Sequence, residues 1–263
     1  MFKPPVRPVV AAVLLTVLVA GCDSASDGAA GNPPGSTAPV TTAPATASTP
    51  TPKPADLSAL SANAILARTK ASTLAAGSVR VRGVITEGGT VTKVDLQLTK
   101  TGGQGVFSAG GAPMTVRVIG KTIYLQMTEA LIRATAKEEK SSRAETEAML
   151  KLMKGKWLKS TKVEEGSRAI VELTTRDLFF KSLFAEIAKL RKSVTRTVDG
   201  VPSIGLTDGG QTLWVDVRNG RPVRLESEEA GSNDYLAFGD YDRLKAPKAP
   251  PARDVIDSDA LGS

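Results

Sequence analysis

Residues 114–127 read MTVRVIGKTIYLQM, and this stretch decides the fold. Apolar side chains occupy every second position on both sides of Gly120-Lys121. Such alternation is typical of a β-strand with one buried face, and two runs joined by a two-residue glycine turn form an antiparallel hairpin. The stretch therefore predicts a sheet with one apolar face and one solvated face.

Similar runs continue this hairpin in both directions along the chain. Asn219-Gly220 joins two of them and is the strongest short-range hairpin signal in the sequence. Residues 245–251 contain three prolines and are predicted to be irregular. In all, the pattern predicts about ten strands, at 79–85, 94–98, 114–118, 123–127, 156–161, 194–198, 203–206, 212–217, 222–227 and 235–241.

Helical spacing marks three other segments. The first begins at Leu57, with Asp56 or Ser58 as its cap and Gly77 as its end. Its expected apolar stripe consists of Leu60, Ala64, Ala67, Ala71 and Leu74. The charged residues 129–154 contain Ser142 and Glu145 at capping-box spacing. In the third segment Thr175 is the expected cap, and a wide apolar stripe consists of Phe180, Leu183, Phe184, Ile187 and Leu190.

These elements predict an α+β fold. A sheet of about ten strands curls instead of staying flat. We therefore expect a strongly curved antiparallel half-barrel, with helices covering its concave apolar face.

The N-terminal residues have the layout of an export signal. Lys3 and Arg7 precede the uncharged apolar stretch 9–20, and Cys22 follows the small residues Ala20-Gly21. The apolar stretch is too short to span a bilayer, which needs about 20 residues. The segment resembles the lipobox of bacterial lipoproteins, which implies a signal peptide 1–21 and a diacylglycerol on Cys22. The alternative is an ordinary secretory signal that contains a cysteine.

Residues 22–55 form the next segment. Beyond Cys22 they are mostly Ala, Gly, Ser, Thr, Pro and Asn, so they cannot bury enough apolar surface to fold. We interpret them as a disordered tether with an r.m.s. span of about 30 Å. A folded domain is expected over 56–257, followed by a disordered tail over 258–263.

The composition excludes several classes of function. The chain has no histidine, so Ser-His-Asp and Cys-His catalysis is excluded and the commonest zinc ligand is missing. The acidic pairs at 138–139, 164–165 and 228–229 are interpreted as solvated surface, and Asp254, Asp257 and Asp259 as a frayed terminus. The glycine pairs at 88–89, 102–103 and 209–210 are interpreted as turns. We expect no enzyme activity, no cofactor and no metal.

The net charge of +7 falls by two when the signal, with Lys3 and Arg7, is removed. A basic mature chain suits a domain held near anionic lipid headgroups. Aromatic residues make up only 4% of the chain, which argues against binding of single-stranded nucleic acid.

Taken in order, the segments resemble the actinobacterial LppX/LprG-type lipoproteins, relatives of the LolA/LolB lipoprotein carriers. After the lipobox and tether, the resemblance is carried by residues 64–67, 78–83, 118–124, 155–157, 198–202, 213–216, 220–224 and 238–241. It implies an open half-barrel whose apolar cavity holds acyl chains of lipids or glycolipids. The charged insert 129–154 is longer than this resemblance leads us to expect.

The resulting expectation is a lipoprotein on the extracytoplasmic face of the cell membrane that binds and hands off lipid. The expected cavity lining is Val81, Leu96, Leu98, Val118, Leu125, Phe180, Leu183, Phe184, Ile187 and Trp214. The phenylalanines at 179, 180 and 184 either line such a cavity or pack as core. The alternative function is a surface sensor or scaffold that binds an envelope protein, with residues 129–156 as the patch. The lysines at 151, 154, 156, 159 and 162 either face the membrane or form a solvated edge.

Overall fold

The computed structural model describes residues 56–162, 165–187 and 190–260. The expected signal peptide 1–21, Cys22 and the tether lie outside these residues. Within them, no helix has the length and apolar character needed to cross a bilayer.

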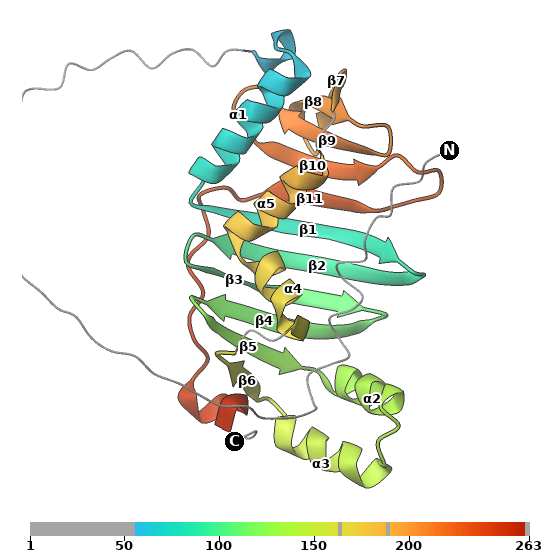
Figure 1. Cartoon of the computed structure of the whole chain (residues 1–263), viewed down its shortest axis with the longest axis vertical. Coiled ribbons are helices and arrows are strands. Elements are labelled where there is room, and N and C mark those ends of the chain that lie inside the picture. Colours follow the sequence, from blue (N-terminus) through green and yellow to red (C-terminus); the bar gives the residue numbers. More distant parts are fainter. Residues whose placement is uncertain (1–55, 163–164, 188–189, 261–263) are drawn as a thin grey trace, which may run out of the picture.

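The described strands form one open sheet with the order β12-β6-β5-β4-β3-β2-β1-β11-β10-β9-β8-β7 (Figure 1). Neighbouring strands pair antiparallel, except that β12 pairs parallel with β6. The strands are β1 (Ser78–Glu87), β2 (Thr90–Thr99), β3 (Gly102–Ala109), β4 (Ala112–Ile119), β5 (Thr122–Met127), β6 (Trp157–Ser160), β7 (Arg191–Val198), β8 (Val201–Thr207), β9 (Gln211–Asp216), β10 (Pro222–Ser227), β11 (Tyr235–Gly239) and β12 (Val255–Asp257).

The hairpin predicted from residues 114–127 is confirmed as β4 and β5. Val116 pairs with Leu125 and Val118 with Ile123, so the apolar sets of both strands share one face. Gly120, in the turn, has a φ of 59°, which a glycine adopts without strain. The Asn219-Gly220 hairpin between β9 and β10 is confirmed as well.

The expectation of about ten strands missed two. The sequence of β3 is rich in glycine, and Gly102-Gly103 was expected to be a turn, yet both residues pair in the strand. β12 is three residues long and pairs with β6, nearly a hundred residues earlier in the chain. Neither strand carries an alternating pattern of its own, because the neighbouring strands supply the pairing.

The helices differ from expectation mainly at the N-terminus. A 3₁₀ turn (Leu57–Ala59), capped by Asp56, precedes α1 (Ala62–Ala75), whose cap is Ser61. The expected stripe of α1 is wrong, since Leu74 is 51% exposed. The buried side consists of Ile65, Leu66, Thr69 and Thr73.

The charged insert forms two helices, α2 (Glu129–Glu138) and α3 (Arg143–Met153), beyond the β5–β6 end of the sheet (Figure 1). The capping box of Ser142 and Glu145 is confirmed. The third predicted segment is confirmed as α5 (Arg176–Glu186), and a helix that was not predicted, α4 (Glu165–Thr174), precedes it. Thr175 is the N-cap of α5 but makes no side-chain capping bond.

The C-terminal residues are more ordered than expected. Residues 245–251 are irregular, as predicted. Residues 258–260, however, form a 3₁₀ turn instead of a disordered tail, because Asp259 accepts hydrogen bonds from Ser160 and Thr161. Asp257 pairs with Lys159 at 2.7 Å, so the expected frayed acidic terminus is wrong.

One main core joins the sheet to α1, α4 and α5, which lie across the same face (Figure 1). The buried residues of this core all lie between Leu57 and Phe238. That a domain over 56–257 folds on its own stays a prediction. The predicted class, an α+β fold with helices over the apolar face of a curved antiparallel sheet, is confirmed.

Candidate functional site

The apolar face under the helices is the candidate site, and we call it the covered face. Alternate side chains of four strands project from it and expose 1% of their surface or less, namely Val81, Leu96, Leu98, Val116, Val118, Leu213 and Val215. The opposite, open face carries Arg80, Asp95, Gln104, Arg117 and Trp214. The period of two along each strand separates the two sets.

Side chains of α5 fill the space above the covered face. Phe180 is 1% exposed and lies at the centre of an aromatic cluster. Its ring centroid is 5.1 Å from that of Phe179, 5.8 Å from Phe184 and 5.9 Å from Phe238. Such ring pairs stabilise a core beyond the area that they bury. Phe179, Phe180 and Phe184 therefore pack as core in this structure.

The helix pair α4–α5 approaches the sheet most closely at Gly103 of β3. A Cβ atom at this position would lie 2.0 Å from the carbonyl oxygen of Thr174, the last residue of α4. No pair of non-bonded atoms tolerates this distance, so only glycine allows α4 to end where it does. α4 itself packs against β2, β3 and β4.

Arg176 fastens the other side of the helix pair. This side chain is 4% exposed and donates from Nη2 to the carbonyl oxygen of Leu74 at 3.2 Å, in the last turn of α1. The carbonyl end of a helix carries a partial negative charge that attracts a cation. Asp177 accepts a hydrogen bond from the same guanidinium. The Nη1 atom of Arg176 has no hydrogen-bond partner among the described residues. Sequence reasoning missed Arg176, because its position beside a capping threonine suggested only a helix start.

The residues expected to line a cavity are brought together, with one exception. Val81, Leu96, Leu98, Val118, Phe180, Leu183, Phe184 and Ile187 belong to the main core, and Leu125 packs against it. The prediction that Trp214 lies with the other residues is wrong, because Trp214 lies on the open face with Val198 and Val223. Its neighbours Leu213 and Val215 are apolar too, so alternation did not reveal which face Trp214 occupies.

Three of these residues border no hollow in the described part of the chain. Val81, Leu98 and Phe180 expose 1% or less of their surface to a water-sized sphere, so no space of that size touches them. Both pockets best defined by the described residues are on the open face. The covered face is therefore closed at the residues named above, and a ligand must displace side chains to reach it.

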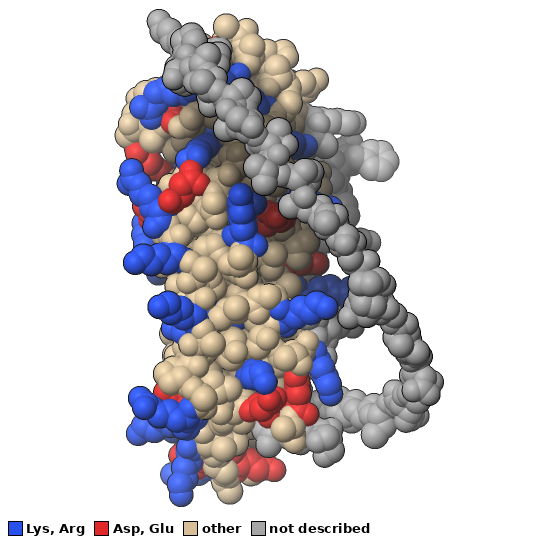
Figure 2. Space-filling model, turned by 90° about the vertical axis from the view of Figure 1, so that its left-hand side faces the viewer, with Lys and Arg blue, Asp and Glu red and all other residues tan. Residues whose placement is uncertain are grey.

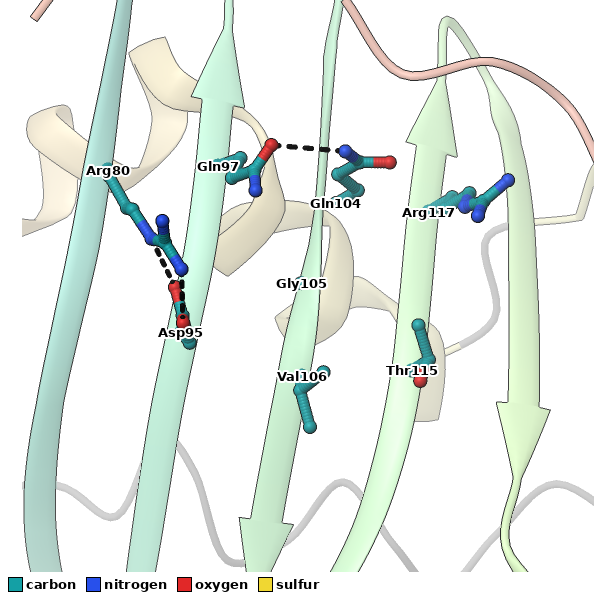
Figure 3. A pocket seen from close by; sticks show the side chains of 8 residues that line it. All are labelled: Arg80, Asp95, Gln97, Gln104, Gly105, Val106, Thr115 and Arg117. Atoms are coloured by element: carbon teal, nitrogen blue, oxygen red, sulfur yellow. Dashed lines mark hydrogen bonds and ion pairs between the residues drawn. The ribbon is translucent and has the colours of Figure 1, made fainter. Parts of the chain in front are cut away.

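The larger open-face pocket has a volume of about 310 Å³ and is polar (Figure 3). Arg80 donates from Nε and Nη2 to the two carboxylate oxygens of Asp95, each at 2.7 Å. These hydrogen bonds lower the pKa of Asp95. Gln104 donates to Gln97 at 3.1 Å. Arg80 and Asp95 thus satisfy each other, as do Gln97 and Gln104 in part, and Arg117 donates to the carbonyl oxygen of Lys248. A ligand would have to compete with these bonds.

The lysines near the expected partner-binding patch, residues 129–156, lie in two different environments. Lys156 and Lys159 face Asp254 and Asp257 at 3.9 and 2.7 Å, so the tail neutralises them. Lys151, Lys154 and Lys162 are exposed. Leu152 on α3 is 54% exposed, which leaves an apolar side chain on the surface of the insert.

Two of the acidic pairs predicted to be solvated can be placed, whereas Glu164 and the side chain of Glu165 lie outside the described part of the structure. Glu138 and Glu139 are exposed on α2, and Glu228 and Glu229 in the β10–β11 turn. Among the described residues, no three side chains of His, Cys, Asp or Glu are arranged to hold a metal ion.

Comparison with known proteins shows no family for this chain. No protein-family model and no curated protein matches the chain. Among solved structures, LprF from Mycobacterium bovis is similar at 15% identity and a TM-score of 0.47, over 71% of this chain and 96% of LprF. LprF belongs to the LppX/LprG group that the sequence resembles.

Two further solved structures are similar at lower scores. An uncharacterized conserved protein from Thermus thermophilus is 11% identical, with a TM-score of 0.37, over 74% of this chain and 98% of that protein. MucB, solved in complex with MucA(peri), is 12% identical, with a TM-score of 0.33, over 73% of this chain and 59% of MucB. At these identities the likeness is one of fold alone.

Proposed function

We propose that this protein is a membrane-anchored lipoprotein that binds the acyl chain of a lipid or glycolipid between the covered face and the helix pair α4–α5, and passes it on within the cell envelope. The observation that carries the proposal is the way in which the helix pair is held. Apolar packing joins it to the sheet, and Arg176 ties it to α1. An acyl chain is itself apolar, so it can take the place of apolar side chains that pack between the helix pair and the sheet.

The energetics favour such an exchange. Each CH₂ group exposed to water costs about 0.8 kcal/mol, so a chain of about 16 carbons faces a penalty of roughly 12 kcal/mol in crossing water. The covered face offers aliphatic and aromatic partners instead. Because it is closed at rest, the bound form requires displacement of Phe180, Leu183 and their neighbours, which the ligand's own burial must offset.

We assign no reaction to this site. In the helices over the covered face, the buried polar side chains among the described residues are Thr69, Thr73, Thr174 and Arg176. The three threonines donate to carbonyl oxygens of their own helices. Such groups hold helices together, and they offer neither an acid–base pair nor a nucleophile.

Acyl binding is tested with residues 56–263 purified from a lipid-containing host. Native mass spectrometry is expected to find a bound lipid. A brominated fatty acid is expected to quench the fluorescence of Phe184→Trp, because that position faces the site. The native protein is the matched control, since Trp214 lies on the open face and Trp157 stacks with Arg117 of that face. Absence of both lipid and quenching would disprove acyl binding.

Anchoring is tested separately in the full chain. We expect a palmitate analogue to label the protein through Cys22, and the variant Cys22→Ala to lose the label and leave the membrane fraction. The chain has no other cysteine, so the variant removes the only thiol. Unchanged labelling of Cys22→Ala would contradict the lipobox interpretation.

A surface scaffold is the second candidate function. It is favoured by the filled covered face, which needs no ligand for stability, and by Leu152 exposed on α3. The two candidates differ in one result. A scaffold gives no bound lipid in native mass spectrometry and yields one stoichiometric partner on cross-linking, which Leu152→Glu abolishes.

A further inference from the structure

The antiparallel topology gathers the turns of the sheet at two ends. One end holds the turns β2–β3, β4–β5, β7–β8 and β9–β10 and the chain that follows β11. Figure 2 views this side of the molecule, and blue side chains follow its whole length. We call it the basic end. Its Lys and Arg residues are Arg68, Lys100, Lys121, Arg218, Arg221, Arg243, Lys245 and Lys248.

The turns at the opposite end have a different character. The β1–β2 and β3–β4 turns there are the glycine pairs 88–89 and 110–111. The β8–β9 and β10–β11 turns at that end carry carboxylates, namely Asp208, Glu228, Glu229 and Asp234. Arg191 and Lys192 begin β7 at the same end, and the helices α2 and α3 carry charges of both signs. The turns of this end are therefore more acidic than those of the basic end.

Several carboxylates at the basic end are already paired with cations, whereas Asp56 accepts a hydrogen bond from the Ser58 N–H and has no ion pair within 4 Å in the described part of the chain. Asp216 pairs with Arg218 at 3.0 Å and Asp242 with Arg221 at 2.5 Å. Asp240 lies 3.9 Å from Arg80. The remaining cations are exposed and have no ion pair within 4 Å in the described part of the chain, namely Arg68, Lys100, Lys121, Arg243, Lys245 and Lys248.

The described chain also begins at this end. Leu57 donates its backbone N–H to the carbonyl oxygen of Val217 at 3.1 Å, and its Cδ1 would lie 3.3 Å from a Cβ on Gly220. Both partners belong to the β9–β10 turn. A tether that precedes Asp56 therefore joins the domain beside the uncompensated cations.

We infer that the basic end docks on the headgroup surface of an anionic phospholipid bilayer, with the strands standing upright on the membrane. The inference rests on the proposed membrane anchor and is independent of acyl binding. Each Lys or Arg near such a surface strengthens binding by about fivefold. A tether of about 30 Å keeps the domain within reach of the bilayer, so weak electrostatic contacts suffice to orient it.

The experiment uses residues 56–263, which contain all the core residues that the structure describes and whose folding is first verified by thermal unfolding, so that no lipid anchor contributes. Sedimentation measures binding to vesicles of phosphatidylcholine alone and of equal parts phosphatidylcholine and phosphatidylglycerol. We expect binding to the anionic vesicles only, and its loss at high salt, since about 1 M salt reduces the Debye length to about 3 Å.

Two triple variants with equal charge change locate the surface. Lys100→Glu, Lys121→Glu and Lys245→Glu together are expected to lower binding at least about 100-fold. The matched control combines Lys93→Glu, Lys137→Glu and Arg143→Glu, which are exposed away from the basic end, and it is expected to lose far less. Thermal unfolding shows whether both triples remain folded.

Three results would overturn the inference. An equal loss of vesicle binding in the two triple variants would mean that binding depends on net charge alone and that no particular face of the domain is turned toward the membrane. Absence of binding to anionic vesicles at low salt would remove the docking surface. Tighter binding to a soluble polyanion such as polyphosphate than to the vesicles would assign the basic end to a different partner. Lipid uptake, measured separately, is unaffected by each of these results.

Discussion

Gly103→Ala is expected to lower the free energy of unfolding by about 3 kcal/mol, near the upper end of the usual cost of overpacking. The added methyl group would lie 2.0 Å from the Thr174 carbonyl oxygen and 3.1 Å from a Leu98 methyl group. Because the first contact is with backbone, a change of side-chain rotamer cannot relieve it and α4 must move. For a domain of this size we expect a fall in Tm of roughly 6–12 °C.

Gly239→Ala is the matched control. Gly239 also lies in a strand, β11, yet nothing lies within 4 Å of a Cβ built there. Its replacement should change the free energy of unfolding by no more than about 0.5 kcal/mol. If both variants have the same Tm as the native protein, α4 does not approach β3 as closely as the structure shows.

The second large effect is expected for Phe180→Ala, which should cost about 3–5 kcal/mol. The substitution removes the central ring of the aromatic cluster and leaves a space between α5 and the covered face. Under the proposed function, that space admits an acyl chain. A long-chain fatty acid should then restore part of the lost stability, because a ligand that binds only the folded state stabilises it. Urea unfolding with and without the fatty acid measures both effects.

Leu178→Ala provides the comparison on the same helix. Leu178 is 39% exposed, so its truncation should cost less than about 1 kcal/mol, with no recovery on addition of fatty acid. Equal costs at positions 178 and 180 would contradict the packing of α5. A large cost at Phe180 without any rescue would identify the cluster as core only and would favour the scaffold.

Local sequence patterns predicted much of the fold. The alternation in 114–127 fixed two strands, their turn and the apolar side of each, because side chains on a strand point to opposite faces in turn. The stripe of Phe180, Leu183 and Phe184 likewise predicted the buried side of α5. These features depend on residues a few positions apart, so the chain itself contains the signal.

Other features had no local signal. β3 is poor in residues that favour strands, and it forms because β2 and β4 offer hydrogen bonds on both sides. α1 is apolar around much of its circumference, so packing decided that Ile65 and Leu66 face the core. Trp214 lies in an apolar run, and only the pairing of β9 with its neighbours placed it on the open face.

The sequence by itself determined the α+β class, the one-sided sheet and the absence of histidine chemistry, because each follows from composition or from spacing along the chain. Tertiary structure alone decided that the covered face is closed, that Gly103 must be a glycine, and that the cations of separate turns meet at one end. Each of these depends on residues far apart in sequence, whose proximity is set by strand pairing and by helix packing.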